Sequence, residues 1–505
     1  MRTHRTHVAA FALAFAPAFA LMAGLALAPL DASAADLADA AQAGDRDQVL
    51  ALLATDADPN LAQVDGTSPL HWASRINDLV MARALIDNGA NATSANRYGV
   101  TPLHLAAVNG SAAMIALLID AGADPNEVGT EGETVLMTAA RTGSVEAVDT
   151  LLARGAEVDR RESWHGQTAL MWAASEGHPD VARTLIANGA DVNADSSIRE
   201  WERQNTAEPR AKWMPLGGLS PITFAARDNC LDCIEILVEA GARIDDADQD
   251  NVTPLVAAIA NGHYDVAAAL VELGADVNIA DGTGRTPLYA AVEFNTMPES
   301  NRPAPEVLWN ETSSFELIQM LVAAGADVNR ALDRQIPYRT KLDRGNDTML
   351  TTGTTPLVRA AKAADVEVIR FLLANGADPA LATRNGINPL MAAAGLGTRD
   401  SDSVGRYKTT EQMTTAITLL MDSGLDPNAT DRNGQTALHG AALQGFDDVI
   451  RFLAEHGASV EIADQDGMTP LDVALGRAGG FGFSGADSVV RESTAAVIRE
   501  YIDLE

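Results

Sequence analysis

The chain has 505 residues, of which 47% are apolar and only 5% are aromatic. This length exceeds what one hydrophobic core usually serves, so we expect several domains or a repeat array, with a core mainly of alanine, leucine, valine and isoleucine. Lys and Arg number 36 against 69 Asp and Glu, a formal net charge of −33. Such a charge repels nucleic acid and anionic lipid, so neither is expected as a partner.

Residues 1–34 have the composition of a secretory signal peptide. Two arginines precede an almost unbroken apolar run over residues 8–30, and the tripeptide Ala-Ser-Ala ends at Ala34. We expect cleavage after Ala34 and export of residues 35–505 without membrane insertion, to the periplasm of a Gram-negative bacterium. In the alternative, the segment is not cleaved and anchors the protein in the inner membrane, because the apolar run is long enough to span a bilayer.

Beyond this segment, a phrase close to TPLHxA recurs from Ser68 to Thr469, most often at a spacing of 33 residues. Ser or Thr before Pro is typical of a helix start. A second helix, with aliphatic residues at helical spacing, ends in most copies at the Gly of a GADxN-like landmark, which suits a left-handed cap. Neither helix can bury its apolar face alone, so each unit needs neighbours on both sides.

This pattern resembles the ankyrin repeat family over nearly all of residues 35–505. A leading unit at 35–60 resembles a capping repeat and brings the total to about twelve. The resemblance implies an all-α solenoid, a curved stack of helix–turn–helix repeats with inner helices, outer helices and β-hairpin fingers along one edge. It also implies that His71, His104 and His439, at the TPLH position, stabilise the fold through local hydrogen bonds.

Irregular repeat spacings locate five insertions. Two of them enlarge fingers and three separate the two helices of one unit. The predicted ranges are 195–219, 295–314, 330–352, 398–412 and 477–488. Insertions of this length are often functional when they are ordered.

Aromatic and basic side chains are concentrated in three of these insertions, and this combination is enriched in binding hot spots. The candidate partner-binding residues are Trp201, Trp213, Trp309, Tyr338 and Arg339. We expect the enlarged fingers to cover part of the concave face and contact a partner. In the alternative, these aromatic side chains only pin long loops to the stack.

The only cysteines are Cys230 and Cys233, at the start of a predicted second helix. Residues three apart on a helix are close enough to bridge, and an exported protein meets oxidising conditions, so this pair is a candidate structural disulfide. A thiol-redox role is the alternative, although the thioredoxin-like strand–helix context is missing.

No catalytic residues, metal site or cofactor site are predicted. The histidines are scattered, and the glycine motif at 480–485 lacks the flanking strand that dinucleotide binding requires. Asp246, Asp248 and Asp250 resemble the start of a calcium loop, but Asn251 and Ala257 stand where that loop needs Gly and Glu.

The sequence therefore predicts a monomeric, non-enzymatic scaffold that binds a protein partner through its concave face and enlarged fingers. A rigid stack binds with little ordering cost, because its surface is formed before contact. The alternatives are an accessory or protective subunit of a periplasmic enzyme, a small-molecule binder and a thiol-redox enzyme. Fold alone does not identify the partner.

Overall fold

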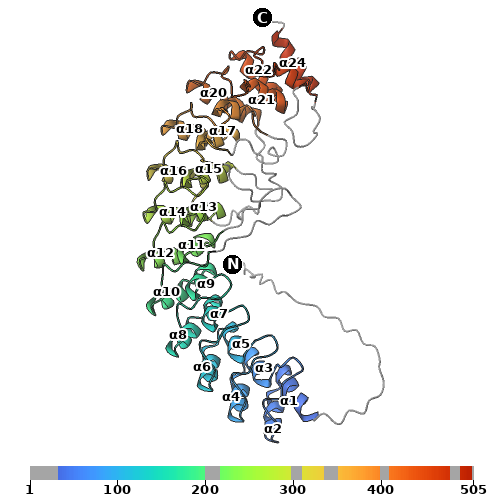
Figure 1. The fold of residues 1–505 in the computed structure, drawn as a ribbon, viewed down its shortest axis with the longest axis vertical. Coiled ribbons are helices and arrows are strands. Elements are labelled where there is room, and N and C mark those ends of the chain that lie inside the picture. Colours follow the sequence, from blue (N-terminus) through green and yellow to red (C-terminus); the bar gives the residue numbers. More distant parts are fainter. Residues whose placement is uncertain are drawn as a thin grey trace, which may run out of the picture.

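The structure, a computed structural model, describes residues 32–198, 216–296, 310–334, 351–398, 409–477 and 490–502. These ranges contain 24 helices in twelve consecutive pairs. The pairs stack side by side into one curved array, with odd-numbered helices along the inner side of the curve and even-numbered helices along the outer side (Figure 1). The all-α solenoid of about twelve repeats is confirmed.

The helix bounds follow the repeat. The inner helices are α1 (Ala32–Ala43), α3 (Pro69–Arg75), α5 (Pro102–Val108), α7 (Val135–Thr142), α9 (Ala169–Ser175), α11 (Pro221–Arg227), α13 (Pro254–Asn261), α15 (Pro287–Thr296), α17 (Pro356–Lys362), α19 (Pro389–Ala393), α21 (Ala437–Gln444) and α23 (Pro470–Ala474). The outer helices are α2 (Arg46–Leu53), α4 (Leu79–Asp87), α6 (Ala112–Asp120), α8 (Val145–Ala153), α10 (Pro179–Ala187), α12 (Leu231–Glu239), α14 (Tyr264–Glu272), α16 (Ser314–Ala323), α18 (Val366–Ala374), α20 (Thr410–Asp422), α22 (Asp447–Glu455) and α24 (Glu492–Ile502).

The TPLH phrase specifies where each inner helix starts. Ser, Thr or Asn stands before the first residue of every inner helix from α3 to α23. In α5 the Thr101 hydroxyl accepts the N–H of His104 at 3.2 Å, and Pro102 occupies the first turn, where a missing N–H costs nothing. Ala106 and Ala107 are fully buried, and such small side chains let neighbouring inner helices approach closely.

The Asn of the GADxN landmark joins one repeat to the next. The Asn126 amide donates to the Gly155 carbonyl at 2.9 Å, and its oxygen accepts the N–H of Glu157 at 2.7 Å. The same pair of bonds is made by Asn60, Asn193, Asn278, Asn329 and Asn428. The landmark thus holds the spacing of the stack as well as ending a helix.

Two histidines of the TPLH phrase also bridge repeats, whereas His104 makes the local contact of its Nδ1 with the Thr101 hydroxyl at 3.0 Å. His71 Nδ1 lies 2.7 Å from the Ser68 hydroxyl, as the family resemblance implies, while its Nε2 lies 3.0 Å from the carbonyl of Val100 in the following repeat. His439 repeats the arrangement with Met468, also at 3.0 Å. Burial lowers the pKa of both imidazoles, which keeps them neutral.

The connections between pairs are tight turns, here called fingers 1 to 11 in chain order. In finger 2 the Asn96 side-chain oxygen accepts the N–H groups of Tyr98 and Val100 at 3.0 and 3.1 Å. Gly99 then takes a φ of 73°, which favours glycine. Within the described ranges only two isolated β-bridges occur, Val128 with Thr134 and Ile198 with Gly217.

Helix ends fall close to the predicted insertion limits. Helix α15 runs on to Thr296 and α20 begins at Thr410, so both extend slightly into ranges expected as insertions. Helix α1 begins at Ala32, so the predicted cleavage position lies in its first turn, and cleavage after Ala34 stays a prediction. Of the helices in the described part of the chain, none is both long and apolar enough to cross a bilayer.

Candidate functional site

Successive fingers are joined by a backbone hydrogen bond at one register position. The Arg384 N–H in finger 9 donates to the Thr352 carbonyl of finger 8 at 2.7 Å, and the Arg432 N–H of finger 10 donates to Asn385 of finger 9 at 2.9 Å. The same register is occupied by the N–H groups of Arg97, Ser197, Gln249, Gly282, Arg334 and Gln465. Because the backbone makes the bond, the side chain there is not fixed by the fold.

In fingers 1, 2, 4 and 5 the tips carry apolar side chains that reach into solvent. The residues are Val64, Tyr98, Trp164 and Ile198. Tyr98 is 55% exposed and Trp164 is 57% exposed, unusually high for large aromatic groups. The Arg97 guanidinium lies 4.8 Å from the centroid of the Tyr98 ring, an arrangement that favours a cation–π contact. We call these four residues the apolar tips.

Three stacks of arginine on an aromatic ring lie on inner helices of the same half. The pairs are Arg75 on Trp72, Arg141 on Trp172, and Arg227 on Phe224, with distances to the ring centroid of 5.3, 5.3 and 4.7 Å. The buried Trp172 indole N–H has no acceptor within the described ranges. Aromatic residues with arginine are the side chains most enriched in binding hot spots, so this half has the composition of a protein-binding surface.

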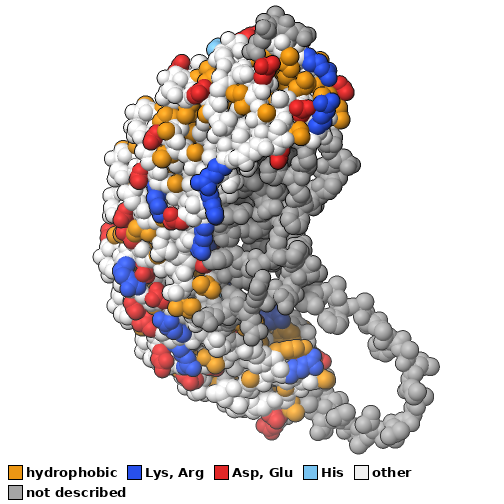
Figure 2. Space-filling model, turned by 45° about the horizontal axis from the view of Figure 1, so that its top comes forward, with side chains coloured by type: hydrophobic (Ala, Val, Ile, Leu, Met, Phe, Trp, Pro, Cys, Tyr) orange, Lys and Arg blue, Asp and Glu red, His pale blue; other side chains and the backbone are white. Residues whose placement is uncertain are grey.

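Fingers 8, 9 and 10 differ, because the joining register holds arginine three times in succession. Arg334, Arg384 and Arg432 are all exposed. We call these three residues the basic tips. Figure 2 shows acidic and basic side chains mixed along the outer-helix side, whereas Lys and Arg gather in a column near the middle of the face in view.

The predicted partner-binding residues cannot be placed. Trp201, Trp213, Trp309, Tyr338 and Arg339 lie outside the described residues.

The flanks of two of these insertions are described, however. Ile198 and Gly217 form a β-bridge, and the Leu332 N–H donates to the Thr354 carbonyl at 3.0 Å. Both enlarged fingers therefore leave and rejoin the stack at closely spaced points on the finger edge.

Sequence reasoning missed the apolar tips. Trp164 and Tyr98 stand just before the finger glycine in SWHGQT and RYGVT, so a comparison of the residues that precede this Gly would have found both.

A buried ionic cluster, also missed, lies in the middle of the stack. Arg285 is 1% exposed; its Nε is 3.0 Å from the Asp281 carboxylate and its Nη1 is 3.4 Å from that of Glu293. The three residues tie finger 7 to α15. The available signal was the arginine directly before TPLY. At this position the other repeats carry an uncharged residue, except for one that carries a glutamate.

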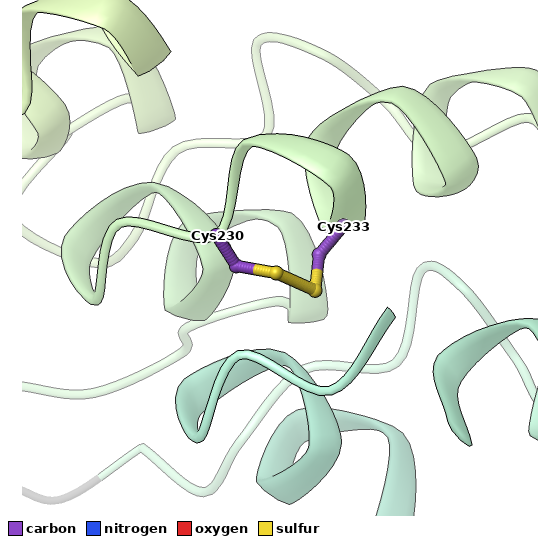
Figure 3. Close-up of a disulfide and its surroundings, with 2 residues drawn as sticks. All are labelled: Cys230 and Cys233. Carbon is purple, nitrogen blue, oxygen red and sulfur yellow. A yellow bond between two sulfur atoms is a disulfide. The ribbon is translucent and has the colours of Figure 1, made fainter. Parts of the chain in front are cut away.

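Cys230 and Cys233 form a disulfide at the start of α12, with 5.2 Å between their Cα atoms (Figure 3). Cys230 is the N-terminal boundary residue of the helix and Cys233 lies in its first turn. Their exposures are 6% and 0%, so the sulfur atoms are within the core rather than at a surface where a redox partner could reach them.

The finger aspartates shape turns. The Asp248 carboxylate uses one oxygen, Oδ1, to accept the N–H groups of Asp250 and Val252 at 2.9 and 2.8 Å. Burial raises the pKa of Asp248 to about 6, against the lowering effect of these two hydrogen bonds. Across the described ranges, no group of three or more His, Cys, Asp or Glu side chains is arranged to hold a metal ion.

A stack of twelve helix pairs joined by hydrogen-bonded fingers is a repeat solenoid. Family models described as ankyrin repeats (3 copies) match residues 37–128, 118–196, 204–281, 223–331 and 409–480, and the single ankyrin repeat model matches residues 352–384. Together these matches cover well over half of the chain. The protein belongs to the ankyrin repeat family.

Relatives resemble this chain through their repeats. An ankyrin repeat and SOCS box protein of Mus musculus is 35% identical over 121 residues, which cover 24% of this chain and 25% of the relative. An ankyrin repeat-containing protein of Schizosaccharomyces pombe is 49% identical over 53 residues, 10% of this chain and 26% of the relative. A palmitoyltransferase of Lachancea kluyveri is 33% identical over 117 residues, 23% of this chain and 14% of that protein. The chain thus covers about a quarter or less of each of these relatives.

Among solved structures, the human ASB11 ankyrin repeat domain is similar, with a TM-score of 0.39 and 24% sequence identity. The match covers 51% of this chain and 97% of that domain.

Proposed function

We propose that this protein is an exported, non-enzymatic scaffold that holds a protein partner against its finger edge and inner helices. The observation that carries the proposal is the exposure of Tyr98 and Trp164 at finger tips of one half of the stack. Large aromatic groups in water are costly unless something covers them, and Tyr and Trp are the residues that most often anchor a protein interface.

The inner helices of the same half support this assignment. The stacks on Trp72, Trp172 and Phe224 hold each guanidinium in place before a partner arrives. A pre-ordered arginine loses less side-chain entropy on binding than a mobile one, so the surface needs little rearrangement. Ankyrin repeats are protein–protein interaction modules in general, which agrees with this use of the face.

The insertions contribute further contacts in this proposal. Trp201, Trp213, Trp309, Tyr338 and Arg339 belong to segments that start or end at the finger edge or beside the inner helices, so they would extend the apolar tips and stacks. The protein is proposed to act as a monomer in the periplasm after cleavage at Ala34, with Cys230 and Cys233 as a structural disulfide.

A cross-linked pull-down from the exported fraction tests the function. It compares wild type with a tip variant (Tyr98→Ala, Trp164→Ala) and a loop variant (Trp201→Ala, Trp213→Ala, Tyr338→Ala, Arg339→Ala). The matched control is Val80→Ala on the outer helix α4, where an apolar side chain is 54% exposed on the opposite side of the repeat.

One partner recovered with wild type and with the control, and lost with the tip variant, would support the proposal. Equal recovery from all four proteins would contradict it. Loss with the loop variant alone would move the binding site to the insertions. N-terminal sequencing of the exported protein tests the cleavage, which should leave Ala35 as the first residue.

A further inference from the structure

We infer that the basic tips, Arg334, Arg384 and Arg432, are a docking surface for an acidic segment of the protein partner. The inference rests on the proposed function and specifies the chemistry of the partner at one end of the stack. The register that joins the fingers decides which side chains stand in a row.

The three arginines stand in adjacent fingers with little freedom between them. The Arg384 N–H donates to the Thr352 carbonyl of finger 8 at 2.7 Å, and the Asn385 carbonyl, one residue after Arg384, accepts the Arg432 N–H at 2.9 Å. A Cβ added at Gly386 would lie 2.9 Å from the Arg432 nitrogen, so fingers 9 and 10 are in direct backbone contact. The spacing of these guanidinium stems is therefore set by the fold.

Two of the three cations are unpaired. Arg384 and Arg432 make no ion pair within the described ranges, whereas exposed arginines elsewhere often pair with a near neighbour, as Arg183 does with Asp180 at 2.7 Å and Arg451 with Asp448 at 3.2 Å. In a chain with 69 acidic residues, two arginines in neighbouring fingers that form no ion pair within the described ranges are available to an acidic ligand.

Acidic residues bound the row. Asp333 beside Arg334 pairs with Arg330 at 2.6 Å, and Asp464 and Asp466 occupy finger 11. A ligand that fits the basic tips must therefore be local, crossing fingers 8 to 10 and no further.

The size and setting of the row decide between acidic ligands. Three cations neutralise too few phosphates to hold nucleic acid at physiological salt. The net charge of −33 also repels any extended polyanion or anionic membrane beyond the screening length of about 8 Å. A short acidic stretch of a protein, brought close by apolar contacts at the other half, meets neither obstacle.

Such a segment would fix the direction in which the partner lies. Its apolar part would face the apolar tips of fingers 1 to 5, and its acidic part would face fingers 8 to 10. Exposed charge pairs contribute little affinity but exclude wrong orientations.

The test is fluorescence anisotropy with a labelled peptide of about ten glutamates, at about 150 mM salt, where protein charges beyond about 8 Å are screened and contacts at the basic tips remain. The variant is Arg384→Gln with Arg432→Gln. The matched control is Arg370→Gln, an exposed arginine on the outer helix α18 of the same region that makes no ion pair within the described ranges. We expect the double variant to bind about fivefold more weakly, at roughly 0.5 kcal/mol for each exposed pair. The control should bind like wild type.

Several results would overturn the inference: no binding of the peptide to wild type, equal binding by the double variant, or an equal loss in the Arg370 control. Stronger binding of an oligonucleotide of the same length, or of vesicles rich in phosphatidylserine, would also overturn it. Rescue of peptide binding by Arg384→Lys with Arg432→Lys would support it.

Its failure is distinguishable from failure of the proposed function. A partner that depends on Tyr98 and Trp164 but is recovered unchanged with the double arginine variant overturns the docking surface alone. Peptide binding at the basic tips, with no partner recovered from the exported fraction, supports the docking surface and contradicts the wider proposal.

Discussion

Fingers 1 to 5 and fingers 8 to 10 share one backbone design and carry opposite chemistry. Arg97 in finger 2 and Arg384 in finger 9 each donate a backbone N–H to the preceding finger, at 2.9 and 2.7 Å. Tyr98, one of the apolar tips, stands next to the first; the second lies between the other two basic tips, Arg334 and Arg432. The backbone hydrogen bonds between successive fingers hold the finger edge together, and they leave the side chains at that register available for recognition.

The division between the two regions falls near the buried cluster of Arg285. This guanidinium replaces the uncharged residue that most repeats place before the inner helix, and it is buried with Asp281 and Glu293. Buried ionic groups are weak sources of stability when intact but costly to break. Finger 7 is thus held to α15 by a buried group whose removal is expected to be costly.

The largest expected effect comes from breaking this cluster. Arg285→Ala leaves the Asp281 carboxylate buried without its cation, and we expect a loss of about 3 kcal/mol in unfolding free energy. Urea denaturation followed by circular dichroism measures it, with the exposed Arg370→Ala as control, expected within about 0.5 kcal/mol of wild type. Two separate transitions would show that the halves then unfold independently. An unchanged midpoint would contradict the predicted cost of leaving Asp281 without its cation.

The next effect separates recognition from stability. Tyr98→Ala with Trp164→Ala should weaken partner binding by about 2 kcal/mol, close to thirtyfold, because both exposed rings act as anchors. The melting temperature should hardly change, since neither ring is in the core. Binding is measured by surface plasmon resonance with the recovered partner, and Val80→Ala serves as control. A drop in melting temperature with unchanged affinity would reverse the assignment of this half.

The disulfide of repeat 6 provides a test close to the division. Cys230→Ser with Cys233→Ala opens a loop of only a few residues, so the chain-entropy account gives a loss of at most about 2 kcal/mol. The helix should remain, because Cys233 occupies an apolar core position. Thermal denaturation of the variant, compared with wild type with and without reductant, measures the change. Any catalysis of insulin reduction by wild type that the variant lacks would favour the redox alternative.

The smallest effect compares two fingers directly. Asp248→Asn in finger 6 introduces the residue that finger 2 already has at this position, Asn96. The side-chain oxygen of Asn96 accepts the N–H groups two and four residues later, as the Asp248 carboxylate does in finger 6. At pH 7 the carboxylate is charged at a cost, since burial raises its pKa to about 6. We expect the variant to be more stable by about 1 kcal/mol, allowing for partial exposure.

The pH dependence gives the sign of this prediction. The folded pKa of Asp248 lies above the unfolded value of 3.8, so its stabilising contribution is present at low pH and is lost as pH rises through about 6. The advantage of the variant should therefore vanish as pH falls from 7 toward 4. Chemical denaturation at several pH values measures it, and Asn96→Asp should show the reverse trend.

The sequence by itself determined the repeat, the number of units and the helix starts. These features depend on local chemistry: Thr101 caps α5, Pro102 fits its first turn, and Gly99 turns the finger before it. The places of the insertions are likewise predicted by counting, since a missing or added residue shifts every later landmark. A repeat protein contacts mainly its neighbours, so local rules determine most of its fold.

Only the tertiary structure decided what faces outward and what meets across repeats. The phrase TPLH does not reveal that His71 reaches the carbonyl of Val100, because the two residues come together only when repeats stack. The sequence RTPLY does not reveal that Arg285 is buried. The separate positions of Arg334, Arg384 and Arg432 in the sequence do not reveal that their fingers are neighbours in the stack. Burial and adjacency arise from the packing of one repeat on the next, and they decide which residues of a repeated phrase are available to a partner.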